Sequence, residues 1–239
     1  MAVVGAAQAT AAVPVLVYHR FDPGQPASMS VRMATFRAQL AWLTQHHYRI
    51  VPLRTALADL ADGKITSVSP EAVITADDGH KTVYTQLFPL IRAEGLPVTL
   101  FIYPSAISNA SYAMTWDELR EMQASGLVDV ESHTYWHPNF KIEKRKRTAA
   151  DYQAFVDNQL QRSKQVLESR MGRTVDMLAW PFGLVDADLE AAAKRAGYTT
   201  AFAYVGGPMK AGDERLALPR IPAADIAGDR FGDLLGVTK

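Results

Sequence analysis

The 239-residue chain contains no cysteine. This absence excludes disulfide bonds, thiol nucleophiles and cysteine-ligated zinc. The chain also has no net charge, because 25 lysines and arginines balance 25 aspartates and glutamates, so its charge gives no indication of a nucleic-acid partner. No apolar run approaches the roughly 18 residues that a membrane-spanning helix needs. We therefore expect no membrane span and a neutral substrate.

The composition, 48% hydrophobic and 21% charged, suits one α/β domain with a full core. The alanine-rich start of the chain contains "AQA", which is similar to a small-residue signal-cleavage site but lacks a positive segment before it. We expect residues 1–12 to be a flexible leader or the remnant of an export signal, and residues 13–239 to form the domain. An export remnant favours a periplasmic or extracellular location.

Apolar β-type runs alternate with helical patterns along the whole chain. The runs cover residues 13–18, 48–53, 72–76, 97–103, 127–132, 175–180 and 199–204. The helical patterns cover residues 34–46, 53–61, 80–94, 115–124, 148–170 and 186–196. Continuous apolar strands separated by helices are typical of a parallel sheet covered by those helices. The sequence therefore predicts an α/β fold, a distorted (β/α) barrel of about seven parallel strands.

Two adjacent carboxylates, Asp77 and Asp78, end the β-type run of "AVITADDG" and precede Gly79. Neighbouring side chains of a strand point to opposite faces, so both can serve one site only where the backbone turns. Reactive residues of such barrels gather at the carboxyl ends of strands. The alternative is an ordinary turn that caps the next helix.

Two histidines, His133 and His137, follow the run 127–132 in "ESHTYWHP". Two imidazoles and one carboxylate would leave open coordination positions on a divalent metal, as a hydrolytic site requires. The alternative for such a pair is packing or surface exposure. The Asp-Asp turn at the same edge of the barrel favours the metal site.

Two further strand ends carry candidates for catalysis. In "LAWPFG", Pro181 and Gly183 would hold the Phe182 N–H as a donor to a developing oxyanion, the alternative being a plain loop. In "VLVYHRF", His19 ends the first strand, where it is either a rim histidine or a catalytic group.

Together these stretches resemble a known family. "TADDG", "HTYWHP" and "WPFG" are similar to the first three motifs of the polysaccharide deacetylases, the NodB-homology domains of carbohydrate esterase family four. The opening "PVLVYHRF", the segment "FRAQLAWLTQHHYRIVPL" and the late "LPRIP" further resemble the subgroup that acts on poly-β-1,6-N-acetylglucosamine. Members of that subgroup have a circularly permuted domain, so the resemblance implies a NodB-like, permuted barrel.

The resemblance also implies roles for these residues. Asp78, His133 and His137 would bind a divalent metal, most readily zinc, with cobalt or nickel as alternatives. Asp77 would be the general base that takes a proton from the attacking water. The Phe182 N–H would stabilise the oxyanion, and His19 would protonate the leaving amine.

The chain departs from the family pattern in two places. Most members carry an arginine three residues before the proline of the third motif, where this chain has Leu178, and this leaves the orientation of Asp77 open. The usual late Leu-x-His motif is replaced by "LALPRIP", which leaves His19 as the only well-placed acid. The basic run "KIEKRKR", residues 141–147, is either a solvated surface or a contact for an anionic polymer.

Several aromatic residues at predicted strand ends are candidates for stacking on sugar rings, the alternative being rim or core packing. These substrate-binding candidates, with the neighbouring proline, are Tyr103, Trp116, Trp136, Trp180 and Pro181.

The sequence as a whole predicts a metal-dependent hydrolase that removes N-acetyl groups from N-acetylglucosamine units of a polysaccharide and releases acetate. One alternative is an O-acetyl esterase acting on an acetylated polysaccharide. The other is a catalytically weak carbohydrate-binding relative, which the missing arginine favours.

Overall fold

The computed structural model describes residues 12–22, 29–66, 68–223 and 225–236. Residues 1–11 of the expected leader lie outside the described residues, and its last residue, Ala12, is the first residue of a strand.

The strands, in chain order, are β1 (Ala12–Val13), β2 (Val15–Tyr18), β3 (Arg20–Asp22), β4 (Ser30–Arg32), β5 (Arg49–Ile50), β6 (Glu71–Asp77), β7 (Val98–Ile102), β8 (Val128–Ser132), β9 (Met177–Ala179), β10 (Thr200–Phe202), β11 (Met209–Lys210) and β12 (Ile221–Pro222). The helices are α1 (Met33–Gln45), α2 (Leu53–Ala61), the π-helix η1 (Val83–Leu87), α3 (Phe88–Glu94), α4 (Trp116–Ala124), α5 (Phe140–Arg145), α6 (Ala149–Met171), the 3-10 turn η2 (Pro181–Gly183), α7 (Ala187–Arg195) and α8 (Asp229–Leu234).

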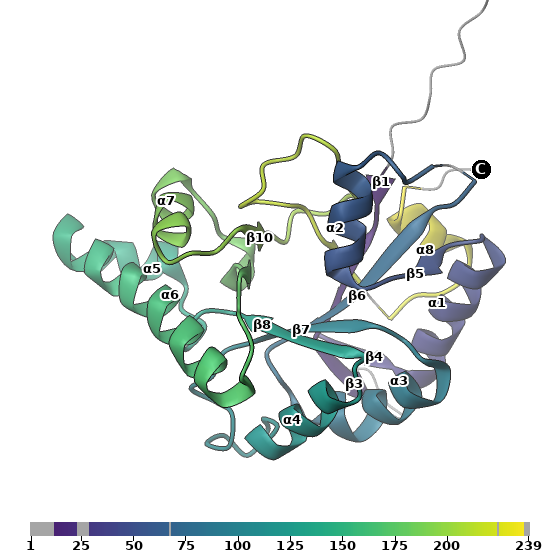
Figure 1. The fold of residues 1–239 in the computed structure, drawn as a ribbon, viewed down its shortest axis with the longest axis horizontal. Helices are drawn as coiled ribbons and strands as arrows, with labels where there is room; N and C mark the ends of the chain where they lie inside the picture. Colours follow the sequence, from purple (N-terminus) through teal and green to yellow (C-terminus); the bar gives the residue numbers. More distant parts are fainter. Residues whose placement is uncertain (1–11, 23–28, 67, 224, 237–239) are drawn as a thin grey trace, which may run out of the picture.

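The main sheet is parallel and curled (Figure 1). Its strands follow the order β10-β9-β8-β7-β6-β2-β12, and β5 adds to β6. Every residue of β6 and β7 is buried, as expected for strands covered on both faces. The predicted α/β class and distorted barrel of about seven parallel strands are therefore confirmed.

The late segment 218–222 contacts both edges of this sheet. Leu218 forms a parallel bridge to Phe202 of β10, whereas Ile221 and Pro222 pair with β2. The segment therefore closes the curl of the sheet, and the residue between these contacts, Arg220, enters the interior of the barrel.

Side chains of the central strand β6 alternate between two cores. Ile74 and Ala76 belong to the larger core, which also contains side chains of the surrounding helices. Val73 belongs to the smaller core in the interior of the barrel. Thr75 and Asp77 continue the inner series, because residues two apart along a strand share a face.

Three predicted elements differ from the structure. The run expected over 13–18 is divided at Pro14 into β1 and β2, and β1 pairs with β11 outside the main sheet. The helix expected over 80–94 is divided into η1 and α3, because Pro89 near the start of α3 lacks the N–H that a continuous α-helix would use. The strand expected over 48–53 is reduced to β5, since Pro52 precedes α2 directly.

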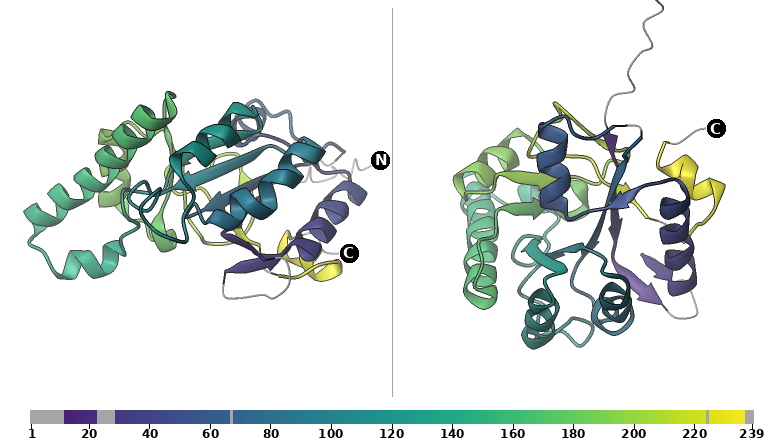
Figure 2. Two further views of the ribbon diagram at one scale, coloured as in Figure 1. Left: turned by 90° about the horizontal axis from the view of Figure 1, so that it is seen from below. Right: turned by 45° about the vertical axis from the view of Figure 1, so that its right-hand side comes forward.

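Helices cover the outside of the sheet, and α5 and α6 lie at the end of the molecule opposite α1 and α8 (Figure 2). Among the described residues, none of the helices combines the length and apolar character needed to cross a membrane.

Candidate active site

The two carboxylates at the end of β6 are brought to one site by a left-handed turn. Asp77 is the last residue of the strand, and the next two residues have positive φ, 73° for Asp78 and 77° for Gly79. A Cβ on Gly79 would lie 3.0 Å from the Cδ1 atoms of Ile102 and Ile107, so glycine suits both the conformation and the space. The turn explains how adjacent residues can share one site.

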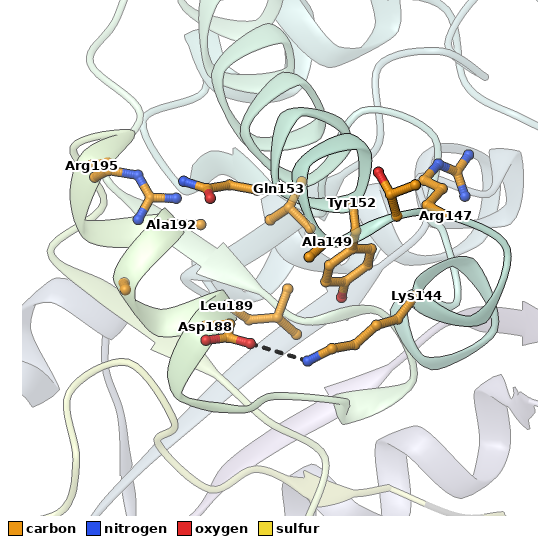
Figure 3. A pocket seen from close by; sticks show the side chains of 12 residues that line it. Lys144, Arg147, Ala149, Tyr152, Gln153, Asp188, Leu189, Ala192 and Arg195 are labelled. Atoms are coloured by element: carbon orange, nitrogen blue, oxygen red, sulfur yellow. Dashed lines mark hydrogen bonds and ion pairs between the residues drawn. The ribbon is translucent and has the colours of Figure 1, made fainter.

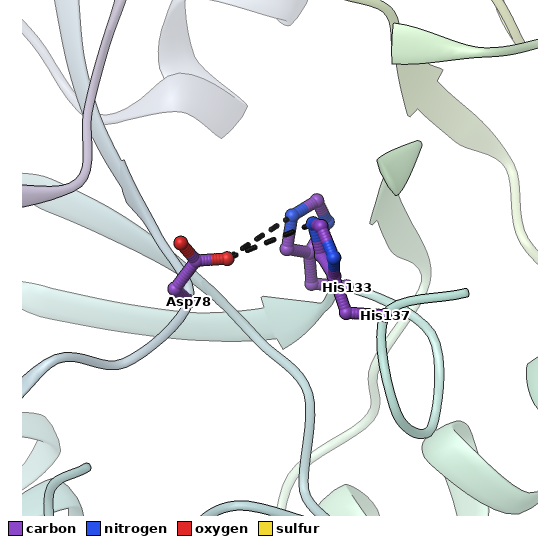
Figure 4. A group of neighbouring side chains, drawn as sticks. All are labelled: Asp78, His133 and His137. Carbon is purple, nitrogen blue, oxygen red and sulfur yellow. Dashed lines mark ion pairs between the residues drawn. The ribbon is translucent and has the colours of Figure 1, made fainter. Parts of the chain in front are cut away.

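Three side chains form a compact group of candidate metal ligands (Figure 4). Asp78 Oδ1 lies 3.7 Å from His133 Nε2 and 3.7 Å from His137 Nε2, and the candidate ligand atoms all lie within 4.8 Å of one another. This oxygen is buried and has no hydrogen-bond partner in the described part of the chain. A buried polar atom without a partner is costly, so its placement between two imidazole nitrogens fits a metal ligand.

The protonation of the two histidines also suits metal binding. His133 Nδ1 lies 2.7 Å from the carbonyl oxygen of Ala179, to which it donates, so that the Nε2 lone pair faces Asp78. Burial lowers the pKa of His133 and of His137, and both rings are therefore neutral at neutral pH. Two neutral imidazoles and one carboxylate are a donor set that zinc and related divalent metals accept, with coordination positions left open.

Asp77 is held by a residue that the sequence analysis did not single out. Arg220 is almost fully buried, and its Nη1 and Nη2 donate to Asp77 Oδ1 and Oδ2 at 2.8 and 2.7 Å. Burial alone would raise the pKa of Asp77, but Arg220 and His133 outweigh burial and lower that pKa to about 2. The presence of Leu178 in place of an arginine had left the orientation of Asp77 open. Arg220 fixes that orientation.

The signal for Arg220 was present in "LALPRIP". An arginine inside an apolar segment requires a buried partner of opposite charge, because an unpaired buried charge is too costly. The sequence alone, however, did not indicate which carboxylate this partner is.

His19 follows β2 directly and lies at the same edge of the sheet. Burial lowers its pKa, while the neighbouring carboxylates of Asp77 and Asp78 oppose this effect. Its ring is 6.0 Å from that of Tyr204, a rim residue that the sequence analysis treated as part of a strand. The structure therefore brings His19 to the side of the site that contains both aspartates.

The turn η2 places Phe182 next to the candidate metal ligand His137. Two hydrogen bonds close it, from Gly183 N–H to Trp180 O and from Leu184 N–H to Pro181 O, and neither uses the Phe182 N–H. The Phe182 ring lies 4.7 Å from that of His137. Phe182 and His137 both adopt positive φ, 57° and 63°, a conformation that costs about 1–2 kcal/mol for a residue other than glycine. Such conformations gather at functional sites.

Gly183→Ala is expected to destabilise the protein by about 3 kcal/mol and to lower its activity, because the new Cβ would lie 2.5 Å from Tyr204 N and also overlap the Tyr204 side chain. Gly63→Ala is the matched control, since Gly63 has the same φ of 67° but no atom within 4 Å of the added Cβ, and it should cost only about 1 kcal/mol. Urea unfolding of both variants measures the difference. Equal losses would contradict a steric role for Gly183.

The remaining substrate-binding candidates separate into two groups. Tyr103 lies at the site, with its ring 5.5 Å from that of His137, and Trp136 is 42% exposed on the loop after β8. Trp116 is buried at the start of α4, under Arg170. Trp180 is fully buried, and its Nε1–H donates to Leu216 O. Trp116 and Trp180 are therefore packing residues, which corrects the expectation that they stack on sugar rings.

Pro181 is buried as well, so it shapes the turn η2 and does not offer a surface to a polymer.

A separate cavity of about 510 Å³ lies between α5, α6 and α7 (Figure 3). It borders the basic run 141–147, whose charges are largely paired within the chain. Lys144 forms ion pairs with Asp186 and Asp188, and Arg147 with Glu143. These pairs support the interpretation of the run as a solvated helix surface.

The sequence of this chain is similar to those of known deacetylases. A family model described as polysaccharide deacetylase matches residues 64–201, more than half of the chain. Poly-beta-1,6-N-acetyl-D-glucosamine N-deacetylase of Staphylococcus aureus is 25% identical over 202 residues, which cover 83% of this chain and 69% of the relative. The protein of the same name from Staphylococcus epidermidis is 25% identical over 210 residues, 86% of this chain and 71% of the relative.

Solved structures show the same fold. IcaB from Ammonifex degensii has a TM-score of 0.80 and 22% identity, with 96% of this chain and 97% of that chain covered. A polysaccharide deacetylase from Bacillus cereus has a TM-score of 0.76 and 26% identity, with 94% and 69% covered. His19 and Arg220 lie outside the 64–201 segment, yet the fold brings both to Asp77.

Proposed function

This chain belongs to the polysaccharide deacetylase family, and from that premise we propose that it removes N-acetyl groups from N-acetylglucosamine units of a poly-β-1,6-linked polysaccharide, releasing acetate. The observation that carries the proposal is the unpaired, buried Asp78 Oδ1 between His133 and His137, beside an Asp77 carboxylate fixed by an arginine. The linkage is inferred from the names of the staphylococcal relatives.

Asp77 is the proposed general base. Its pKa of about 2 keeps it ionised at all working pH values, and the two hydrogen bonds from Arg220 fix the direction in which it accepts a proton. Asp78, His133 and His137 are the proposed ligands of a divalent metal, most readily zinc. When bound, such a metal supplies Lewis acidity that polarises a carbonyl and lowers the pKa of water.

His19 is the proposed general acid, and the Phe182 N–H is the proposed oxyanion donor. An amine is a poor leaving group unless it receives a proton, and His19, which lies beside both aspartates and is not a candidate metal ligand, is the histidine available to deliver one. Preorganised N–H donors of this kind contribute about 3 kcal/mol in other enzymes.

The catalytically weak alternative rested on the missing arginine near Pro181. Arg220 supplies a guanidinium to Asp77 from another part of the chain, so this departure from the family pattern no longer favours a binding module. Because the staphylococcal relatives are named for a poly-β-1,6-N-acetyl-D-glucosamine polymer and the start of the chain is similar to a signal-cleavage site, we also propose that the protein acts outside the cytoplasm, in the periplasm or beyond the cell.

Acetate release from a poly-β-1,6-N-acetylglucosamine oligomer tests the proposed function. Chelator-treated protein should release none, and addition of zinc, cobalt or nickel should restore release. Restored metal binding without acetate would contradict the proposed function.

His19→Ala is expected to reduce hydrolysis of the N-acetyl oligomer by about 10²–10³-fold and hydrolysis of an acetyl ester by at most about tenfold, because an alkoxide leaves more readily than an unprotonated amine. Steady-state kinetics on both substrates with the same metal-loaded preparation measures the two losses. Equal losses would show that His19 is not the acid. Acetate release from an O-acetylated polysaccharide with none from the N-acetyl oligomer would favour the O-acetyl esterase.

A further inference from the structure

Exposed aromatic residues are confined to one edge of the described structure. Of the Phe, Tyr and Trp residues in the described ranges, three have exposed side chains: Tyr112 at 41%, Trp136 at 42% and Phe182 at 58%. They lie on the loops that follow β7, β8 and β9, which are neighbours in the sheet. The metal-ligand candidates lie at the same edge. We name these three residues the aromatic row.

Ring contacts connect the aromatic row to the site. The Phe182 ring lies 4.7 Å from His137, and the Tyr103 ring lies 5.5 Å from His137. The Tyr103 hydroxyl is 2.8 Å from the Tyr112 hydroxyl. A continuous series of rings therefore runs from Phe182 past a candidate metal ligand to Tyr112.

Folding of the chain does not explain the choice of phenylalanine at position 182. The left-handed conformation favours glycine or asparagine, and the exposed ring gains little from packing. An exposed apolar side chain held in a strained conformation beside a site is explained by contact with a ligand.

Tyr112 is held firmly at the other end of the aromatic row. Its carbonyl oxygen accepts from Lys81 N–H at 2.8 Å, and Met114 N–H donates to Gly79 O at 2.9 Å. These bonds attach the Tyr112 loop to the turn that carries Asp78. A surface fixed in this way loses little conformational entropy when it binds.

We propose that the aromatic row binds consecutive sugar units on both sides of the unit that is deacetylated, with Phe182 and Tyr112 at its two ends. The proposal rests on the proposed function and adds that the preferred substrate is an internal unit of a neutral chain. One face of a pyranose ring consists of C–H groups, which pack on an aromatic ring without needing a charged partner.

Binding without turnover tests the proposal. Calorimetric titration of the metal-free protein with β-1,6-linked N-acetylglucosamine oligomers of increasing length should give an affinity that rises with length. Tyr112→Ala and Phe182→Ala should each weaken binding of a pentamer by about five- to tenfold and remove most of this length dependence. Ile142→Ala, which truncates a side chain of 47% exposure on α5, is the matched control and should bind as the unaltered protein does.

Phe182→Gly distinguishes the ring from the backbone, because glycine accepts the left-handed conformation and should lose the same affinity without loss of stability. The proposal would be overturned if Tyr112→Ala and Phe182→Ala both bound the pentamer as the unaltered protein does. It would also be overturned if they lost affinity for the monomer and the pentamer equally. Acetate release together with unchanged binding would contradict the aromatic row alone. Length-dependent binding through the row without acetate release would contradict the proposed function alone.

Discussion

Arg220→Met is expected to lower the free energy of unfolding by about 3–5 kcal/mol and kcat by at least about 10²-fold. The substitution leaves the Asp77 carboxylate buried without its cationic partner, and an uncompensated buried charge is among the most destabilising changes in a protein. Because Arg220 also lowers the pKa of Asp77, the acidic limb of the pH profile of kcat/KM should move to higher pH. Denaturant unfolding and steady-state kinetics measure these effects.

The double variant Asp77→Asn, Arg220→Met separates stability from catalysis. It removes both charges, so it should recover most of the lost stability while activity stays absent. Arg220→Lys keeps the charge but lacks the planar guanidinium that donates from two nitrogens to the two oxygens of Asp77, and we expect an intermediate loss of activity. A stable, active Arg220→Met protein would contradict the positioning role of Arg220.

Asp78→Asn is expected to abolish measurable acetate release, a loss of about 10³-fold or more, and yet to stabilise the metal-free protein by about 1 kcal/mol. The carboxylate oxygen is buried and unpaired, and burial raises the pKa of Asp78 to about 6, so its charged form is unfavourable without a cation. Asparagine removes this charge and, with it, most of the affinity for a divalent metal. Residues retained at a cost in stability are characteristic of functional sites.

Thermal unfolding of chelator-treated and zinc-loaded protein measures both effects of Asp78→Asn, the gain in stability without metal and the loss of metal binding. Zinc should raise the Tm of the unaltered protein, as any ligand that binds only the folded state does, and should leave that of Asp78→Asn almost unchanged. Asp62→Asn is a suitable control, because Asp62 is an exposed aspartate that forms a surface ion pair with Lys64. A metal-free Asp78→Asn protein less stable than the unaltered one would contradict the unpaired state of this oxygen.

The sequence alone indicated which strand ends carry the candidate site. Asp77 and Asp78 before Gly79, and His133 with His137, could be proposed because short-range patterns report where a strand ends and which side chains follow it, and because the motifs resemble those of a known family. The alternation of strands and helices along the chain followed from hydrophobic periodicity, which is also a short-range pattern. The circular permutation implied by the resemblance stays a prediction.

Only the tertiary structure decided which distant residues contact these side chains. Arg220 is 143 residues from Asp77 along the chain, and closure of the sheet by segment 218–222 brings the two together. Trp116 and Trp180 had the same local signal as Trp136, but burial depends on which helix or loop packs over each position. Local sequence therefore determined the carboxyl edge of the barrel, whereas long-range packing determined which charges pair and which aromatic rings remain exposed.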